Sequence, residues 1–217
     1  MIQPLHRAPS VGLTRRAILP GLCLTIVGMA QSAQAGLVTN VSIAYRGFKI
    51  DLAGFGTPAE TEAAAKVVRE QIDMVERVGL PSSLLGFFKT MPLRVGHDLR
   101  GFFGTYYQGA IALSPDQLDS HNPTLLHEFM HAVHDKRLPD SFANKEIAAF
   151  YTDAFYNKRY EGTNGAYFLL NAHEFFAVTA TVFLYGKLPR NRPYARSEIR
   201  TAQPDYYKFL AKLFGSR

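Results

Sequence analysis

The sequence predicts one domain of the α+β class, because strand-like segments come first and helix-like segments follow them. Its 217 residues are enough for a domain of ordinary size. Hydrophobic residues make up 47% of the chain and charged residues 19%, which is typical of a globular protein. Neither an internal repeat nor a low-complexity stretch divides the sequence, so we expect no second folded domain.

The first 35 residues resemble an export signal. A basic start is followed by an apolar run from about Ala17 to Ala30, and the triplet Ala33-Gln34-Ala35 suits a signal peptidase. The pair Arg15-Arg16 resembles the twin-arginine export motif, and an ordinary Sec signal with two adjacent arginines is the alternative. We therefore expect residues 1–35 to be a signal peptide and residues 36–217 to be the mature domain.

The mature protein is then expected in the periplasm or outside the cell, without stable insertion into a membrane, because the apolar run is too short to span a bilayer. Cys23 is the only cysteine and leaves with the signal, so any metal must be held by nitrogen and oxygen atoms. Loss of the leader's three arginines leaves 21 basic residues against 18 acidic ones. This mild excess gives no reason to expect a nucleic-acid partner.

The strand-like segments precede and follow one predicted helix. Residues 41–54 are rich in β-branched and aromatic residues and predict one or two strands. A helix is predicted over 57–79, where Thr57, Pro58 and Glu60 form an N-terminal capping signature. Residues 91–96 predict a short strand. Residues 101–115 predict a hairpin with Gln108-Gly109 near its turn.

Four helices are predicted in the second half of the chain. The first begins after Asn122-Pro123 and ends at Leu138-Pro139, because proline fits a helix start and disfavours its continuation. The others are expected at about 144–159, about 166–185 and 204–214, and a basic loop is expected around 187–198.

The first of these helices carries the pattern H-E-x-x-H at His127, Glu128 and His131. Residues four apart on a helix lie on one face, so the two imidazoles can bind the same ion. Glu128, one residue on, can reach a water on that ion without binding the ion. This is the arrangement of zinc metallopeptidases, with Glu128 as the general base. The alternative is an amphipathic helix with solvated histidines.

A catalytic zinc keeps three protein ligands and one open position, so a third ligand is needed. The pattern H-E-x-x-H-x-x-G-x-x-H is not continued, because His134 stands in place of its glycine and Arg137 in place of its last histidine. Glu146 and Glu174 remain as candidates. We favour Glu174, which lies among apolar residues where an unpaired carboxylate is costly, whereas Glu146 lies near a helix start.

The combination of "HEFMHAVHD" with "YFLLNAHEFFA" about forty residues later resembles the catalytic domain of anthrax toxin lethal factor and its relatives, including the Pro-Pro endopeptidases. That family pairs H-E-x-x-H with a later Y-x(6)-E, which falls here on Tyr167 and Glu174. Asn171 and Phe175-Phe176 also match, and the similarity covers roughly residues 101–214.

The resemblance implies a zincin-like metallopeptidase fold, with a small mixed sheet, an edge strand, an active-site helix and C-terminal helices. It also implies one Zn²⁺ per chain, endopeptidase activity, and a protein or peptide substrate bound extended along the edge strand. Tyr167 would stabilise the oxyanion. If Tyr167 and Glu174 share one helix they also share a face, although a core aromatic is the simpler meaning of the tyrosine alone.

The chain departs from the family at Val178, where an acid that supports a zinc-bound histidine often stands. Asp135, Asn171 or a backbone carbonyl are the candidates for that support. Tyr106 and Tyr107 alternate along the hairpin, and Tyr107 is a candidate for substrate contact. Two other functions stay open: a catalytically inactive zincin-like envelope protein that binds peptide or zinc, and a protein in which zinc is only structural.

Overall fold

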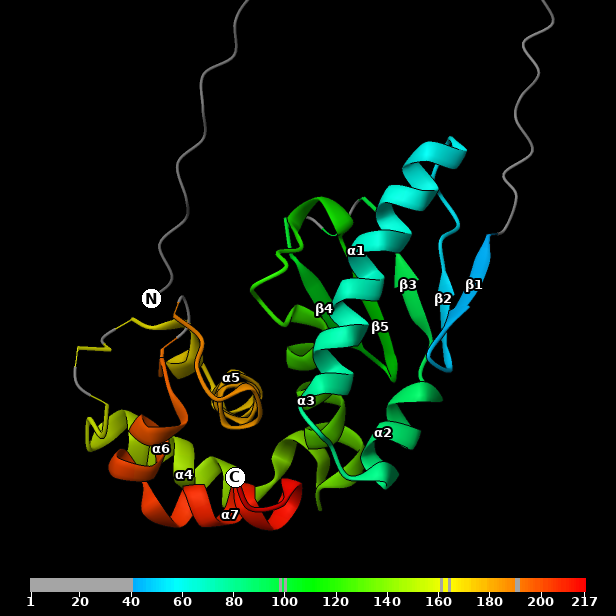
Figure 1. Ribbon diagram of the computed structural model, residues 1–217. Coiled ribbons are helices and arrows are strands. Elements are labelled where there is room, and N and C mark those ends of the chain that lie inside the picture. Colours follow the sequence, from blue (N-terminus) through cyan, green and yellow to red (C-terminus); the bar gives the residue numbers. More distant parts are fainter. Residues whose placement is uncertain (1–40, 98, 100, 161, 164, 190–191) are drawn as a thin grey trace, which may run out of the picture. The chain divides into compact units, whose positions relative to one another are not determined.

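We describe the protein from a computed structural model, which covers residues 41–97, 99, 101–160, 162–163, 165–189 and 192–217. The predicted α+β class is confirmed, because the first half of the chain forms a small mixed sheet and most helices follow it (Figure 1). The signal peptide expected at residues 1–35 lies outside the described residues. None of the described helices has the length and apolar character that crossing a membrane requires.

The sheet contains five strands in the order β1-β2-β3-β5-β4. Strands β1 (Ser42–Tyr45) and β2 (Phe48–Asp51) pair antiparallel, and β2 pairs in parallel with β3 (Leu93–Val95). Strand β3 also pairs in parallel with β5 (Ala110–Leu113), and β5 pairs antiparallel with β4 (Gly104–Tyr107). Strand β4 is therefore an edge of the sheet. The predicted hairpin is confirmed, and positive φ angles of 48° at Gln108 and 85° at Gly109 make its tight turn.

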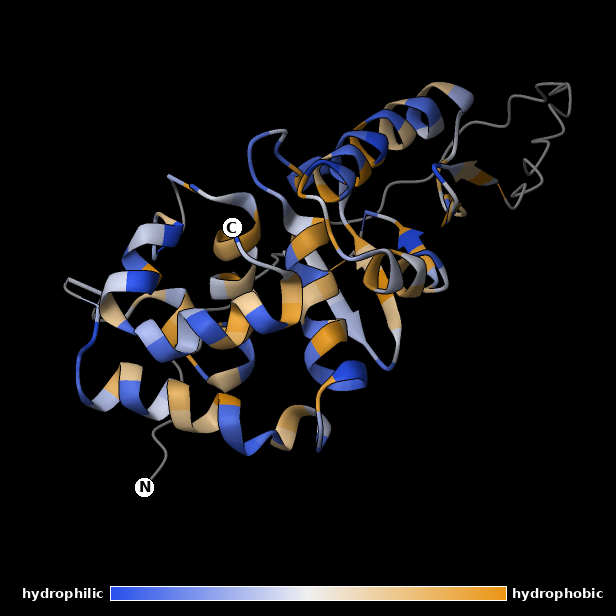
Figure 2. Cartoon of the chain, turned by 60° about the horizontal axis from the view of Figure 1, so that its bottom comes forward, coloured by the Kyte–Doolittle hydropathy of each residue, from blue (hydrophilic) through white to orange (hydrophobic). Residues whose placement is uncertain are grey.

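Helix α1 (Pro58–Arg77) begins with the expected capping box. The Thr57 hydroxyl accepts from the Glu60 amide, and the Glu60 carboxylate accepts from the Thr57 amide at 2.9 Å. Figure 2 shows hydrophilic and hydrophobic residues on different sides of this long helix. Helix α2 (Ser82–Lys89) was not predicted, and its start at Pro81 has no side-chain cap that could have announced it.

Among the described residues of the second half, the α-helices are α3 (Thr124–Arg137), α4 (Lys145–Tyr156), α5 (Ala172–Tyr185), α6 (Arg196–Ala202) and α7 (Pro204–Phe214). Helix α6 replaces part of the expected basic loop. The prediction of one helix over 166–185 was wrong in its first part. A short 3-10 helix, η3 (Tyr167–Leu169), precedes α5, and α5 begins only after Asn171.

Aromatic contacts join the sheet to α3 and α5 to the last helix. The ring of Phe129 on α3 stacks on Phe88 with centroids 4.1 Å apart, and it also meets Phe48 on β2 at 5.9 Å. On the other side, Phe175 of α5 stacks on Tyr206 of α7 at 4.8 Å. Helices α3 and α5 pack along each other between these groups. These contacts therefore fix α3 against the sheet and α5 against α7, so that the positions of the two helices relative to each other are well defined.

Candidate metal centre

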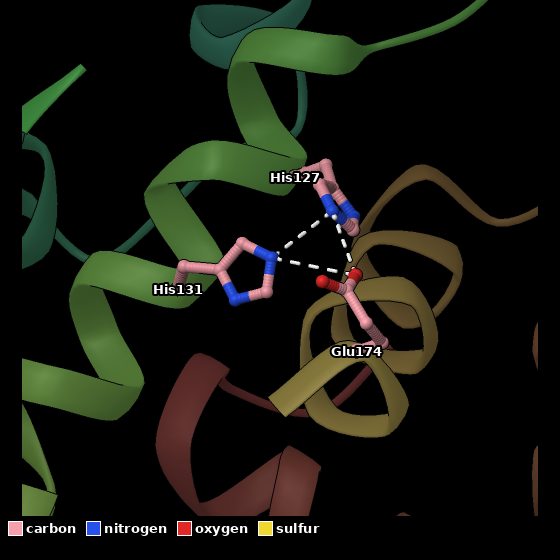
Figure 3. A group of neighbouring side chains, drawn as sticks. All are labelled: His127, His131 and Glu174. Carbon is pink, nitrogen blue, oxygen red and sulfur yellow. Dashed lines mark hydrogen bonds and ion pairs between the residues drawn. The ribbon is translucent and has the colours of Figure 1, made fainter. Parts of the chain in front are cut away.

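Helices α3 and α5 bring His127, His131 and Glu174 together, so that their side chains point at one another (Figure 3). The Nε2 atoms of the two histidines are 3.1 Å apart. Oε2 of Glu174 lies 3.3 Å from Nε2 of His127 and 3.5 Å from Nε2 of His131. The third candidate ligand is thus the expected one, whereas Glu146 is exposed in the first turn of α4 and does not belong to the group.

The triangle fits a single metal ion. Ligand atoms about 2.0–2.1 Å from a tetrahedral ion are about 3.3–3.4 Å from one another, close to the observed sides. Oε2 of Glu174 is buried and accepts no well-oriented hydrogen bond from a described residue, so its charge is compensated by ion pairing with the two histidines, and a bound cation would compensate it further. Burial alone would raise the pKa of Glu174, but the two histidines outweigh it and hold this pKa below its usual range.

Helix α3 begins at a proline without a side-chain cap, and Gln71 of α1 takes the place of that cap. Its Nε2 donates to the carbonyls of Asp119 and Asn122, both at 2.9 Å, and its Oε1 accepts from the Leu125 amide at 3.1 Å. Gln71 is only 1% exposed, so these bonds are shielded from water. This residue fixes the start of the metal-binding helix, and nothing in the local sequence announced it.

Asn171 positions Glu174. Its side chain accepts a hydrogen bond from the Glu174 backbone amide at 2.9 Å, which makes Asn171 the N-cap of α5. This role in the helix start is a different one from the support of a metal-bound histidine for which Asn171 was one of three candidates. The pattern Asn171-x-x-Glu174 is itself a helix-start signature, and it could have placed the beginning of α5 from the sequence.

Glu128 lies beside the triangle and is 5% exposed. Burial raises the pKa of its carboxyl to about 7, and the Glu174 carboxylate adds to this effect. His131 and the backbone amide of Tyr106, which donates to the Glu128 carboxylate, act in the opposite direction. Glu128 is therefore a buried acid outside the ligand triangle, as the sequence pattern predicted.

Gly104 at the start of β4 is a site residue that the sequence reasoning missed. A Cβ atom at this position would lie 3.0 Å from Cγ and 3.1 Å from Oε1 of Glu128, and 3.1 Å from Cδ2 of Leu113. Contacts this short are tighter than most real Cβ contacts, so with any other residue here the Glu128 or Leu113 side chain would have to move by a few tenths of an ångström.

Tyr167 lies next to the triangle, with its ring centroid 6.3 Å from that of His127. It belongs to η3, so the argument that it shares a helix face with Glu174 was wrong, although the residue does reach the site. Its side chain is not a core aromatic, because the residue is 56% exposed. Burial of the phenol oxygen and the nearby Glu174 carboxylate raise the pKa of Tyr167, which keeps the phenol protonated as a donor.

Asp135 ties α3 to the edge strand. It accepts a hydrogen bond from the Tyr106 hydroxyl at 2.6 Å and another from the Ser141 hydroxyl. Burial raises the pKa of Asp135, but these two bonds and the contact with Lys136 outweigh it, so this pKa lies below its usual range. Tyr106 is therefore the hairpin tyrosine that faces the protein, whereas Tyr107 is 69% exposed at the end of β4.

His134, one turn after His131, is fully buried, and neither of its ring nitrogens has a hydrogen-bond partner among the described residues. Its ring packs against those of Phe142, His173 and Phe176. Burial and the neighbouring histidines lower the pKa of His134 to about 4, so the ring stays neutral. His173 is half-buried, and its ring stacks on that of Phe142 with the centroids 4.4 Å apart.

No family model, no characterised protein and no solved structure matches this chain.

Proposed function

We propose that this protein is an exported zinc-dependent endopeptidase with a zincin-like fold. The observation that carries the proposal is the triangle of His127, His131 and Glu174, whose sides of 3.1–3.5 Å suit one tetrahedral ion. Two imidazoles and one carboxylate are a common ligand set of catalytic zinc, which leaves a fourth position for water or substrate. A purely structural zinc needs a fourth protein ligand, and the described residues place no further histidine or acid in this group.

The residues around the triangle suit peptide hydrolysis. When bound, zinc would supply a Lewis acid that polarises the scissile carbonyl and lowers the pKa of the attacking water. Glu128 accepts the proton of that water and passes it to the amine that leaves. Tyr167 donates a hydrogen bond from its phenol to the carbonyl oxygen as negative charge develops on it. The inactive envelope protein remains the alternative, and the presence of both Glu128 and Tyr167 argues against it.

The edge strand β4 suits an extended substrate. The Phe103 carbonyl accepts from the Ser114 amide at 3.0 Å, and backbone groups alternate in direction along an antiparallel pair. The carbonyl and amide of Gly104 and the carbonyl of Tyr106 therefore point away from β5. A peptide that adds to this edge would run past Glu128, because Gly104 lies directly against that carboxylate.

Two measurements on the purified protein test this function. Metal analysis should give about one zinc per chain for both the wild type and Glu128→Gln. Against a mixture of proteome-derived peptides, Glu128→Gln should lose at least about a hundredfold in turnover, because the variant keeps the shape but lacks the base. An active Glu128→Gln enzyme would sink the mechanism, and a wild type that cleaves nothing would favour the inactive alternative.

Export is tested separately. N-terminal sequencing of exported protein should give Gly36 as the first residue, since the Ala33-Gln34-Ala35 triplet precedes it. Export should fail when Arg15 and Arg16 are both replaced by lysine. Normal export of this double variant would leave only the Sec route.

A further inference from the structure

A hollow of about 460 Å³ opens beside the metal ligands. Its walls come from the segment before β4, the start of α3, η3 and α5, and His127 and Glu128 are among the lining residues. This volume lies within the range of about 300–1,000 Å³ that is usual for small-ligand pockets. A group bound in the hollow therefore lies next to the position where chemistry would occur.

The hollow has an exposed rim and a buried bottom. Phe102, Phe103 and Tyr167 line it and are 62%, 51% and 56% exposed, so they surround the opening. The rim is thus aromatic.

The bottom consists of Phe168, Val178 and Thr181, which line the same hollow and are at most 5% exposed. Val178 and Thr181 lie four and seven residues after Glu174 on α5, so they share its helix face. The Thr181 hydroxyl already donates to the Ala177 carbonyl at 2.7 Å. The bottom therefore offers mainly carbon atoms to a guest.

Two formally charged residues line the hollow among those described, Glu128 and Arg192. The Glu128 carboxylate on the wall disfavours an acidic guest. The guanidinium of Arg192 is half-buried and lies 4.3 Å from the centroid of the Tyr194 ring. A charged side chain that entered the hollow would also lose its hydration, and the bottom offers no opposite charge in return, so its transfer from water costs free energy.

We propose that the hollow binds one bulky uncharged side chain, aromatic or long aliphatic, of a peptide aligned along β4. Val178 and Thr181 set the size of the accepted side chain. This inference rests on the proposed function, since it names the residue beside the scissile bond that the enzyme selects. Burial of such a side chain should favour binding by about ten- to hundredfold over alanine.

Five capped pentapeptides, Ac-Gly-Gly-Xaa-Gly-Gly-NH₂ with Phe, Leu, Ala, Asp or Lys at Xaa, test the proposal. Each contains one side chain, so the group that binds is known. Titration of the zinc-loaded protein, followed by NMR of the Val178 and Thr181 methyl groups, gives the affinity and the place of binding together. We expect the Phe and Leu peptides to shift these methyl signals with dissociation constants at least about tenfold below that of the Ala peptide.

Two variants narrow the bottom, and one serves as a matched control. Val178→Phe and Thr181→Leu should remove the advantage of the Phe peptide over the Ala peptide, while zinc content stays the same. Either variant suffices if the other fails to fold. Thr181→Val keeps the size of the side chain and should keep the advantage, because recognition does not depend on the hydroxyl.

The outcomes separate this inference from the proposed function. Equal affinities for the five peptides, or binding that leaves both methyl signals unmoved, overturn the inference. Preference for the Asp peptide that is lost in Arg192→Met also overturns it. If the Phe and Leu peptides bind as expected but no peptide is ever cleaved, the side-chain site stands and the peptidase fails. If all five peptides are cleaved at equal rates, the peptidase function stands and the side-chain site fails.

Discussion

Replacement of Gln71 by methionine should destabilise the protein at the start of the metal-binding helix. Methionine keeps the length of the side chain and its burial but removes the amide. The substitution leaves the Leu125 N–H without its partner at 3.1 Å, in a residue that is fully buried. The Asp119 and Asn122 carbonyls lose less, because each still accepts from a backbone amide of its own loop, at 3.1 and 2.8 Å.

The expected loss follows from these three groups. An orphaned buried N–H costs about 1–3 kcal/mol, and each bond to a carbonyl that keeps another donor contributes about 0.5–1.5 kcal/mol. The sum is about 2–6 kcal/mol, and we take about 3 kcal/mol as the expected loss in free energy of unfolding. For a domain of this size that lowers the melting temperature by about 6–12 °C.

Urea unfolding of the metal-free protein measures this loss, and hydrogen exchange of the Leu125 amide locates it. Gln117→Met is the matched control, because Gln117 is exposed. The control should lie within about 0.5 kcal/mol of the wild type. If Gln71→Met is equally stable and its Leu125 amide exchanges no faster, Gln71 does not hold the start of α3.

Three further predictions concern the site. Glu174→Ala should lose the zinc that Glu146→Ala retains, as elemental analysis of the two purified variants would report; the reverse pattern would make Glu146 the ligand. Gly104→Ala should keep zinc but lose at least about tenfold in turnover, because its Cβ would displace the Glu128 carboxylate by a few tenths of an ångström; unchanged kinetics would show that Glu128 tolerates this displacement. The folded-state pKa of Asp135 is lowered, so its stabilising effect is fully present above the ordinary aspartate pKa of about 4 and is lost as the pH falls below that value and through the lowered folded-state pKa. Unfolding curves of Asp135→Asn should therefore depend less on pH on the acid side than those of the wild type, and identical acid-side slopes would contradict this assignment.

The parts of the fold with local signals were predictable from the sequence. Thr57, Pro58 and Glu60 announce α1 within four residues, and Gln108-Gly109 announces a tight hairpin. The spacing of four residues between His127 and His131 was enough to predict that both side chains lie on one face of a helix. Helix α2 has no such cap, and its short apolar run fits a strand or a loop equally well, so it was missed.

The parts of the site that depend on distant contacts were not predictable. Gln71 meets Leu125 across 54 residues, and Gly104 meets Glu128 across 24. No local sequence pattern around Gln71 or Gly104 indicates which distant residue it contacts. Tyr167 reached the site for a different reason from the one expected, since η3 and not α5 carries it. Local periodicity places residues on a face, whereas the packing of α3 on β4 and α5 decides what that face meets.

The sequence of helix α5 makes the unfolded chain prone to aggregation. Its buried stretch 175–184, FFAVTATVFL, contains neither a charged residue nor a proline and is rich in β-branched and aromatic residues. A segment of this kind is prone to intermolecular β-aggregation whenever it is exposed. In the folded protein α3, α4 and α7 cover it. In a newly made or denatured chain nothing does, so refolding should fail increasingly as protein concentration rises, and a chaperone that shields this stretch should restore the yield.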